Sequence, residues 1–288
     1  MQNFNFIRPD NLEEACDLLV RYKDRAKLIA GGTDLIIALR EEKLPNCLEI
    51  IIDISNLEEL NHIKEEGKYI RIGSGVKHAE IAKNKLIKKY APVLSMAASV
   101  VGSPQIRNRG TIVGNIVTAS PAADTIPALI VLDSILVIRK GKEKRKMFLK
   151  DVFEGPNKVN LKSDEMVYEI YFEKLPLGAK SDFIKLARRN AVDKSRMNIA
   201  VVAQQNKSKE ITDIRISVGS LTPIPGRFKD AEDLLLGEIP TQDLIQKAGK
   251  KIAEEMINKS GYRWSTEYKE PVVKSLIDRV LNRIVEVE

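Results

Sequence analysis

The chain has 288 residues, of which 43% are hydrophobic and 30% charged, and its formal net charge is +7. This length allows two or three domains with cores of their own, and the hydrophobic content is ordinary for a globular protein. No apolar stretch of about 18 residues and no signal-peptide pattern occurs, and the only cysteines are Cys16 and Cys47; we therefore expect a cytoplasmic protein without a membrane span and without its own iron–sulfur or zinc motif.

The first part, residues 1–55, is expected to form a small βαβ-like lobe. Apolar residues recur at helical spacing after Asn11, a candidate N-cap, and they place Cys16 in the core. The predicted elements are a helix at 11–22, a strand at 27–30, a short helix at 34–41 and a strand at 48–54.

The second part, residues 56–175, mixes strands and helices. A strand is predicted at 69–72, a long helix at 79–100, a helix at 125–132, and strands at 135–139 and 166–172. The basic run Lys140–Lys146 follows an apolar strand pattern. We interpret it as the solvated tip of a hairpin rather than a nucleic-acid site, because neither interleaved aromatic residues nor a known binding motif accompanies it.

The third part, residues 176–288, begins within a loop predicted at 175–182. Its predicted strands lie at 183–187, 199–204 and 211–218, and its predicted helices at 231–236, 242–258 and 271–285. The last helix has Pro271 near its expected start. The whole chain is therefore predicted to be α+β.

A run of small residues at 111–127 is the most informative segment. It reads Thr-Ile-Val-Gly-Asn-Ile-Val-Thr-Ala-Ser-Pro-Ala-Ala-Asp-Thr-Ile-Pro. Small residues let a ligand approach the backbone, and hydroxyl and N–H groups supply donors for phosphate and sugar oxygens. An ordinary loop is the alternative.

A second glycine segment lies upstream at 28–35, reading Leu-Ile-Ala-Gly-Gly-Thr-Asp-Leu. A short strand, a glycine turn and a helix start, with Thr33 and Asp34 as candidate caps, are a typical arrangement for binding an anion. The segment is neither a dinucleotide-binding fingerprint nor a P-loop, and by itself it fits a plain strand-to-helix turn as well.

Taken together, these segments resemble the FAD-binding subunit of the molybdenum hydroxylases, the family of xanthine dehydrogenase, carbon monoxide dehydrogenase and nicotinate dehydrogenase. The match covers nearly the whole chain. The matching segments are Ala30–Asp34, Gln105–Gly110, Thr111–Asn115, Ala119–Asp124, Lys185–Arg189 with Asp193, Val218–Arg227 and Tyr262–Tyr268.

The resemblance implies a two-lobed FAD-binding domain of the vanillyl-alcohol oxidase / p-cresol methylhydroxylase type, followed by a C-terminal α+β domain. It also implies FAD, which takes electrons from iron–sulfur clusters and passes them to NAD. The FAD is expected to be noncovalent, because both histidines lie outside the two glycine segments and no cysteine or histidine occurs in 111–127. The implied partners are a molybdopterin-binding large subunit and a 2Fe-2S small subunit, in a dimer of heterotrimers. Gln105–Arg107 and Arg109 are candidates for an intersubunit face, or for ordinary solvated loop residues.

The residues that the resemblance assigns to FAD fall into three groups. Those near the pyrophosphate and sugars are Leu28, Ile29, Ala30, Gly31, Gly32, Thr33, Asp34, Leu35, Gly110, Thr111, Gly114, Asn115, Thr118, Ser120 and Asp124. Those beside the adenine or flavin rings are Val101 and Val117, and Val167 and Lys185 are later contacts. Lys185 would place positive charge near the flavin; a solvated strand lysine is the alternative.

Two positions depart from the family pattern. Val113 stands where the family usually has glycine, which puts the local path of that segment in doubt if the backbone there needs a positive φ. Lys194 follows Asp193 where the family usually has an apolar residue.

No catalytic side chain and no metal site are predicted. His62 and His78 are expected at the surface, and no nucleophile with a base or pair of carboxylates is evident. A protein of this kind leaves the chemistry to a bound cofactor. The alternatives are a stand-alone flavin oxidoreductase and a non-enzymatic nucleotide-binding domain.

Overall fold

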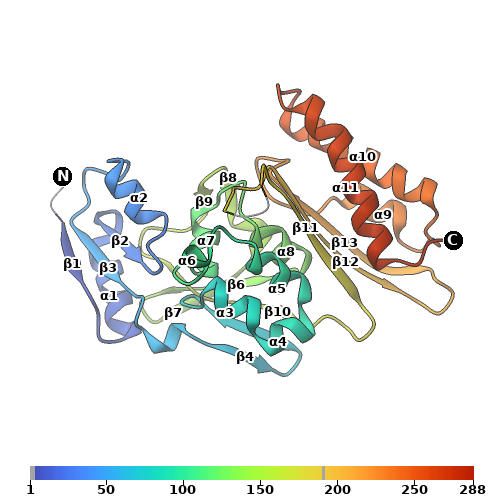
Figure 1. The fold of residues 1–288 in the computed structure, drawn as a ribbon. Coiled ribbons are helices and arrows are strands. Elements are labelled where there is room, and N and C mark those ends of the chain that lie inside the picture. Colours follow the sequence, from blue (N-terminus) through green and yellow to red (C-terminus); the bar gives the residue numbers. More distant parts are fainter. Residues whose placement is uncertain (1–3, 190–191) are drawn as a thin grey trace.

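The computed structural model describes residues 4–189 and 192–288. Three parts follow one another across the molecule: an N-terminal lobe, a middle lobe, and a C-terminal part in which a sheet separates the middle lobe from a layer of helices (Figure 1). Each part has its own cluster of buried apolar residues. The predicted α+β class is confirmed.

The N-terminal lobe is a parallel sheet with one long helix. Its strands are β1 (Asn5–Ile7), β2 (Ala26–Ile29) and β3 (Ile50–Asp53), in the order β1-β3-β2. Helix α1 (Leu12–Tyr22) begins where predicted, because the Asn11 side chain accepts a hydrogen bond from the Glu14 N–H at 2.9 Å. A 3₁₀ turn (Lys23–Arg25) and the short helix α2 (Leu35–Arg40) complete the lobe.

The core of the N-terminal lobe extends onto the middle lobe. Cys16 is buried as predicted, and its Sγ lies 3.6 Å from the Sδ of Met166, a residue of the middle lobe. The two lobes are therefore packed against each other through apolar contact.

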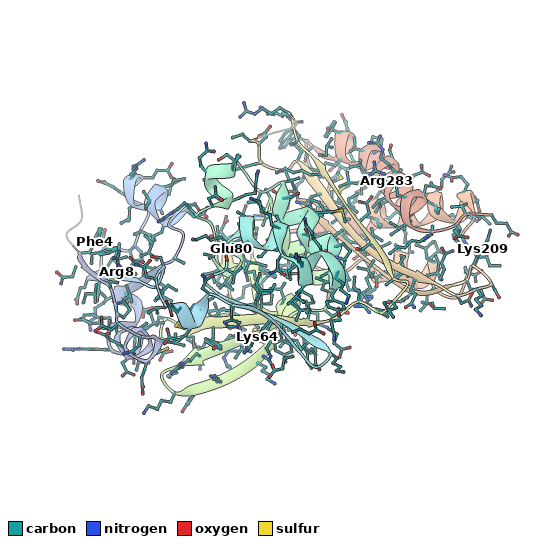
Figure 2. All side chains as sticks on the ribbon, turned by 60° about the horizontal axis from the view of Figure 1, so that its bottom comes forward. Phe4, Arg8, Lys64, Glu80, Lys209 and Arg283 are labelled. Carbon is teal, nitrogen blue, oxygen red and sulfur yellow. The ribbon has the colours of Figure 1, made fainter. Side chains whose placement is uncertain are left out.

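The middle lobe is built on a five-stranded antiparallel sheet in the order β4-β5-β10-β6-β7. The strands are β4 (Ile63–Glu66), β5 (Tyr69–Gly73), β10 (Met166–Glu173), β6 (Ile135–Lys140) and β7 (Glu143–Phe148). Figure 2 brings this side forward, with Lys64 on β4. The hairpin at the basic run is confirmed, but its tip is only Gly141 and Lys142, since Lys140 ends β6 and the residues from Glu143 onward belong to β7.

The prediction of one long helix at 79–100 is wrong. Three short helices replace it: α3 (His78–Lys83), α4 (Lys85–Tyr90) and α5 (Pro92–Ser99). Asn84 is extended and its side chain accepts hydrogen bonds from the Leu86 and Ile87 N–H groups, so it ends one helix and caps the next. Pro92 opens the third helix, because proline is tolerated in a first turn and disfavours a helical residue before it.

The run of small residues at 111–127 contains one helix and the start of another. Helices α6 (Pro104–Arg107), α7 (Ile112–Thr118) and α8 (Thr125–Val131) follow one another, and α8 is buried along its whole length. The remaining elements of the lobe are two 3₁₀ turns (Glu58–Leu60, Leu149–Asp151) and the small pair β8 (Phe153–Gly155) and β9 (Lys158–Val159).

The C-terminal part consists of a three-stranded antiparallel sheet and three helices. Its strands are β11 (Lys180–Leu186), β12 (Met197–Gln205) and β13 (Ile211–Gly219), and its helices α9 (Lys229–Leu235), α10 (Gln242–Ser260) and α11 (Thr266–Ile284). Pro271 lies inside α11, so this helix begins earlier than predicted.

Both faces of this sheet are buried. Along β12, Ala200 and Val202 belong to the core of the middle lobe, whereas Ile199 and Val201 belong to the core under the C-terminal helices. Because side chains alternate along a strand, an uninterrupted apolar run serves both sides. The sheet thus fixes the C-terminal part onto the middle lobe.

Candidate functional site

The two glycine segments, far apart in the sequence, touch in the structure. A Cβ added to Gly31 would lie 2.2 Å from the Arg109 carbonyl oxygen and 2.9 Å from the Gly110 Cα. A Cβ on Gly110 would in turn lie 3.5 Å from the Thr33 Oγ1. The sequence predicts both segments as parts of one site, and the fold brings them into direct contact.

The first segment offers unpaired backbone donors. The N–H groups of Gly31, Gly32 and Thr33 have no hydrogen-bond partner within the described part of the chain. Gly32 has φ +73°, a conformation that glycine adopts without strain. The expected cap is wrong in detail, since the Asp34 side chain makes no capping bond and instead accepts a hydrogen bond from Thr33 Oγ1 at 3.3 Å.

The second segment is held by Thr111, which caps α7. Its Oγ1 accepts a hydrogen bond from the Gly114 N–H at 3.1 Å, and a Cβ at Gly114 would lie 2.9 Å from the same oxygen. Val113 sits in the first turn of α7 and is absent from the positive-φ residues. The backbone at Val113 is therefore ordinary helix, and valine at the family's glycine position does not require a positive φ.

Asn115 and Ser120 shape the backbone beyond α7. The Asn115 Oδ1 accepts a hydrogen bond from Thr125 Oγ1 at 2.8 Å, which ties α7 to α8. After Thr118, Ala119 adopts the left-handed conformation, and the Ser120 hydroxyl accepts a hydrogen bond from the Ala122 N–H. Ser120 is half-exposed at this turn.

Asp124 is bound from all sides by this chain's own residues. One carboxylate oxygen accepts from Ser195 Oγ at 2.5 Å and from Asn198 Nδ2 at 3.2 Å. The other accepts from Lys185 Nζ at 2.8 Å, and the same ammonium also donates to the Val100 carbonyl at 2.9 Å. Asp124 and Lys185 are both largely buried, so Lys185 is not a solvated strand lysine.

The apolar residues predicted near the rings differ in exposure. Val117 is 42% exposed, whereas Val101 and Val167 are buried. Val167 lies at a bulge of β10, where the pairing with β6 is interrupted. Leu28, Ile29, Ala30 and Leu35 are half-buried around the first segment.

His78 is buried, so the prediction of a surface residue is wrong. Its N–H donates to the Gly110 carbonyl at 3.1 Å, which fixes the backbone just before Thr111. Its Nδ1 has no partner within the described chain. Burial, with a smaller contribution from Arg107, lowers the pKa of His78 to about 4. Sequence reasoning missed it because a lone histidine carries no periodic signal.

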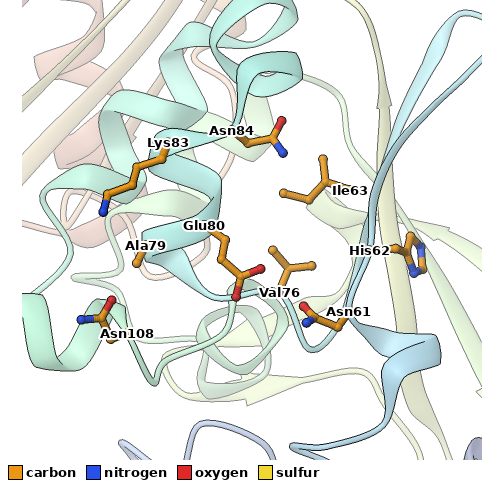
Figure 3. Close-up of a pocket in the computed structure, with 9 residues that line it drawn as sticks. All are labelled: Asn61, His62, Ile63, Val76, Ala79, Glu80, Lys83, Asn84 and Asn108. Atoms are coloured by element: carbon orange, nitrogen blue, oxygen red, sulfur yellow. The ribbon is translucent and has the colours of Figure 1, made fainter.

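A well-defined cleft lies outside the predicted site. Its volume is about 560 Å³, and it is open between α3 and the chain that leads into β4 (Figure 3). Asn61, His62, Glu80, Lys83 and Asn108 contribute its polar groups. None of the residues assigned to FAD lines it, so its size does not make it the cofactor site.

Comparison with known proteins identifies the family. Residues 2–174 match the FAD binding domain in molybdopterin dehydrogenase, and residues 182–284 match the CO dehydrogenase flavoprotein C-terminal domain. The chain is 32% identical to the nicotinate dehydrogenase FAD-subunit of Eubacterium barkeri, covering 99% of this chain and 97% of that one. It is 31% identical to the nicotine 6-hydroxylase medium subunit of Paenarthrobacter nicotinovorans, covering 96% and 95%.

A solved structure has the same fold over nearly the whole chain. The carbon monoxide dehydrogenase of Hydrogenophaga pseudoflava that lacks the Mo-pyranopterin moiety has a chain with a TM-score of 0.89 and 27% identity, covering 97% of this chain and 96% of that one. The present chain therefore belongs to the FAD-binding subunits of the molybdenum hydroxylases, and it is an oxidoreductase subunit. Within residues 4–189 and 192–288, no helix has the length and apolar character needed to cross a membrane.

The residues present fit FAD. The N–H groups of Gly31, Gly32 and Thr33 are unpaired within the described chain, and neither Gly31 and Gly32 nor the neighbouring Gly114 carries a side chain. Backbone donors beside glycines are suited to a pyrophosphate, whose oxygens only accept hydrogen bonds. Exposed apolar Val117 is suited to an aromatic ring system.

Proposed function

We propose that this chain carries noncovalent FAD as the electron-transfer subunit of a molybdenum hydroxylase complex. It would take electrons from the iron–sulfur clusters of a partner and pass them to NAD or another acceptor. The observation that carries the proposal is the contact between the Gly31–Gly32 segment and the Arg109–Gly110 segment, with three unpaired N–H groups beside it.

In this proposal the pyrophosphate lies over the two segments. The backbone of Ile29–Asp34 donates to phosphate oxygens, and Thr111, Gly114 and Asn115 close the opposite side with small groups. Leu28 and Leu35 supply the apolar flanks. The ribose and ribityl hydroxyls lie along Gly110, Thr118 and Ser120.

The rings are proposed to rest on apolar side chains, with Val101 and Val117 as their neighbours and the Val167 main chain at one edge. FAD supplies one-electron acceptance and hydride donation when it is bound. The chain's own part is to bind, orient and shield it.

Lys185 and Asp124 have different roles in this proposal. The ammonium of Lys185 is fixed by Asp124 and the Val100 carbonyl, so its positive charge is held in one place beside the flavin segment. Asp124 acts through Lys185, since both of its oxygens already have partners in the chain.

The partners proposed are a molybdopterin-binding large subunit and a 2Fe-2S small subunit, in a cytoplasmic dimer of heterotrimers. The names of the relatives support membership of a multisubunit complex, since they are a FAD-subunit and a medium subunit. We also propose that residues 1–55 and 56–175 form two lobes of the vanillyl-alcohol oxidase / p-cresol methylhydroxylase type, and that 176–288 forms the C-terminal domain.

Purification of the chain alone and with the two partner subunits tests the proposal. The chain alone should contain FAD and reduce artificial dyes with NADH, yet hydroxylate no purine or aromatic heterocycle. Hydroxylation should require all three subunits. A chain without flavin would favour a nucleotide-binding domain, and a flavoprotein that forms no complex would favour the stand-alone oxidoreductase.

A further inference from the structure

A cluster of exposed aromatic and arginine side chains lies where α10 meets α11. Trp264 is 95% exposed, Tyr262 68% and Tyr268 45%, and Arg263 stands between the first two. The guanidinium of Arg196 lies 5.7 Å from the centre of the Tyr268 ring. We refer to these five residues as the Trp264 patch. Its composition is that of the centre of a protein interface, where tryptophan, tyrosine and arginine are enriched.

The backbone beneath the Trp264 patch is held firmly. Arg263 donates its N–H to Thr266 Oγ1 at 2.8 Å and its Nε–H to the Ser260 carbonyl at 2.9 Å. Ser260 Oγ donates to the Leu221 carbonyl at 2.8 Å. The backbone of this loop therefore needs little further ordering on binding.

The same loop connects to the segment proposed to hold the flavin. The Pro121 carbonyl accepts hydrogen bonds from the N–H and the hydroxyl of Ser220, at 2.9 and 3.2 Å. Lys269 of α11 donates to the Ser220 carbonyl at 2.5 Å. Pro121 directly follows Ser120, so a partner seated on the patch would be close to the proposed flavin.

The positive charges of the Trp264 patch favour an acidic partner. Arg196 and Arg263 form no ion pair with any described residue, and the only acid in sequence between the patch residues 262–268 is the exposed Glu267. A second copy of the chain would bring like charges together across a symmetric contact, which is unfavourable. A partner with acidic side chains around an apolar centre fits instead.

We propose that the Trp264 patch docks an acidic face of the iron–sulfur subunit, with Trp264 as the central contact. This inference rests on the proposed function, because it places the electron donor beside the segment assigned to the flavin. Arg196 and Arg263 pair with carboxylates of the partner, and Tyr262 and Tyr268 flank the tryptophan.

The test uses the full chain with FAD and the iron–sulfur subunit encoded with it, and measures their dissociation constant. Trp264→Ala should weaken binding about 30-fold, and Arg263→Glu should weaken it strongly and reduce its dependence on salt. Leu177→Ala and Arg279→Glu are the controls, because Leu177 is 94% exposed and Arg279 is an exposed arginine of α11. Both should bind as the unaltered chain does.

Flavin content separates this inference from the proposed function. All four variants should retain FAD and dye reduction with NADH. Unchanged binding in Trp264→Ala and Arg263→Glu, failure of the unaltered chain to bind the iron–sulfur subunit, or loss of binding to the molybdopterin subunit alone would each overturn the assignment. Absence of flavin from the unaltered chain would overturn the proposed function instead.

Discussion

Asp124 is the most heavily bonded acid of the candidate site, with Lys185, Ser195 and Asn198 all donating to it. Asp124→Asn removes the charge that holds the Lys185 ammonium and leaves a buried cation without its partner. We expect a loss of about 3 kcal/mol in the free energy of unfolding, measured by denaturant titration on the apoprotein. Asp34→Asn, at an exposed acid of the first segment, should cost little. Unchanged apoprotein stability with weaker FAD binding would instead mark Asp124 as a direct ligand.

The glycines of the first segment are constrained for different reasons. Gly31→Ala would push a methyl group into the Arg109 carbonyl, and Gly32→Val would strain a backbone at φ +73°. Both variants should lose FAD, as judged by the ratio of flavin to protein absorbance. Gly114→Val should do the same, since its side chain would meet Thr111 Oγ1. Gly155→Ala, with open space around its Cβ, is the control and should keep full flavin occupancy.

His78 predicts a pH dependence of stability. Its folded pKa of about 4 lies below the usual value, so the unfolded chain binds a proton that the folded chain does not. The stability that neutral His78 contributes is present above about pH 6.5 and is lost as the pH falls toward 4. When the pH is lowered from 7 to 5, the free energy of unfolding of the unaltered protein should fall by about 2 kcal/mol more than that of the His78→Gln variant, as measured by denaturant titration at each pH. Equal losses in both proteins would contradict the assignment.

At the scale of elements, Asn84 explains why one long apolar region forms separate helices. It is the C-cap of α3 and the N-cap of α4, and it satisfies two N–H groups of α4. Asn84→Ala should lower the free energy of unfolding by about 1 kcal/mol, measured by chemical denaturation. Lys83→Ala, at an exposed neighbour that caps nothing, should change stability by less. A larger effect at Lys83 would show that the capping argument is incorrect.

Both edge strands of the middle sheet are among the strands that sequence reasoning missed. β4 and β7 read Ile-Lys-Glu-Glu and Glu-Lys-Arg-Lys-Met-Phe, which are polar because one side of an edge strand meets water. The central strands β5, β6 and β10 were predicted from their apolar residues. The strands of the middle sheet that could be predicted from the sequence are therefore those with buried, apolar residues.

At the scale of the molecule, the two lobes and the C-terminal sheet meet around the candidate site. Gly31 comes from the N-terminal lobe, Thr111 and Asp124 from the middle lobe, and Lys185 from the C-terminal sheet. Cofactor binding should therefore stabilise the whole protein rather than one part. Addition of FAD to the apoprotein should raise the midpoint temperature of a single unfolding transition. Several transitions, of which only one shifts to higher temperature, would contradict this.

The flavin should be noncovalent, because candidate attachment residues are poorly placed. His78 and Cys16 are buried, and the His62 Nε2 lies 3.2 Å from a carboxylate oxygen of Glu169. Cys47 is exposed but lies outside both glycine segments. Acid precipitation should release all flavin into the supernatant. Yellow colour in the washed pellet would show a covalent bond.

The sequence by itself determined the family and the α+β class, and it predicted the two segments proposed to bind FAD, because glycines, small residues and apolar periodicity are features of the local sequence. Only the tertiary structure decided that Gly31 lies against Arg109, that Asp124 holds Lys185, and that His78 is buried. Each of these depends on residues that are distant in the chain and meet through packing, and no local pattern encodes such a meeting. These contacts between distant residues could not be predicted from the sequence, and the tertiary structure shows them.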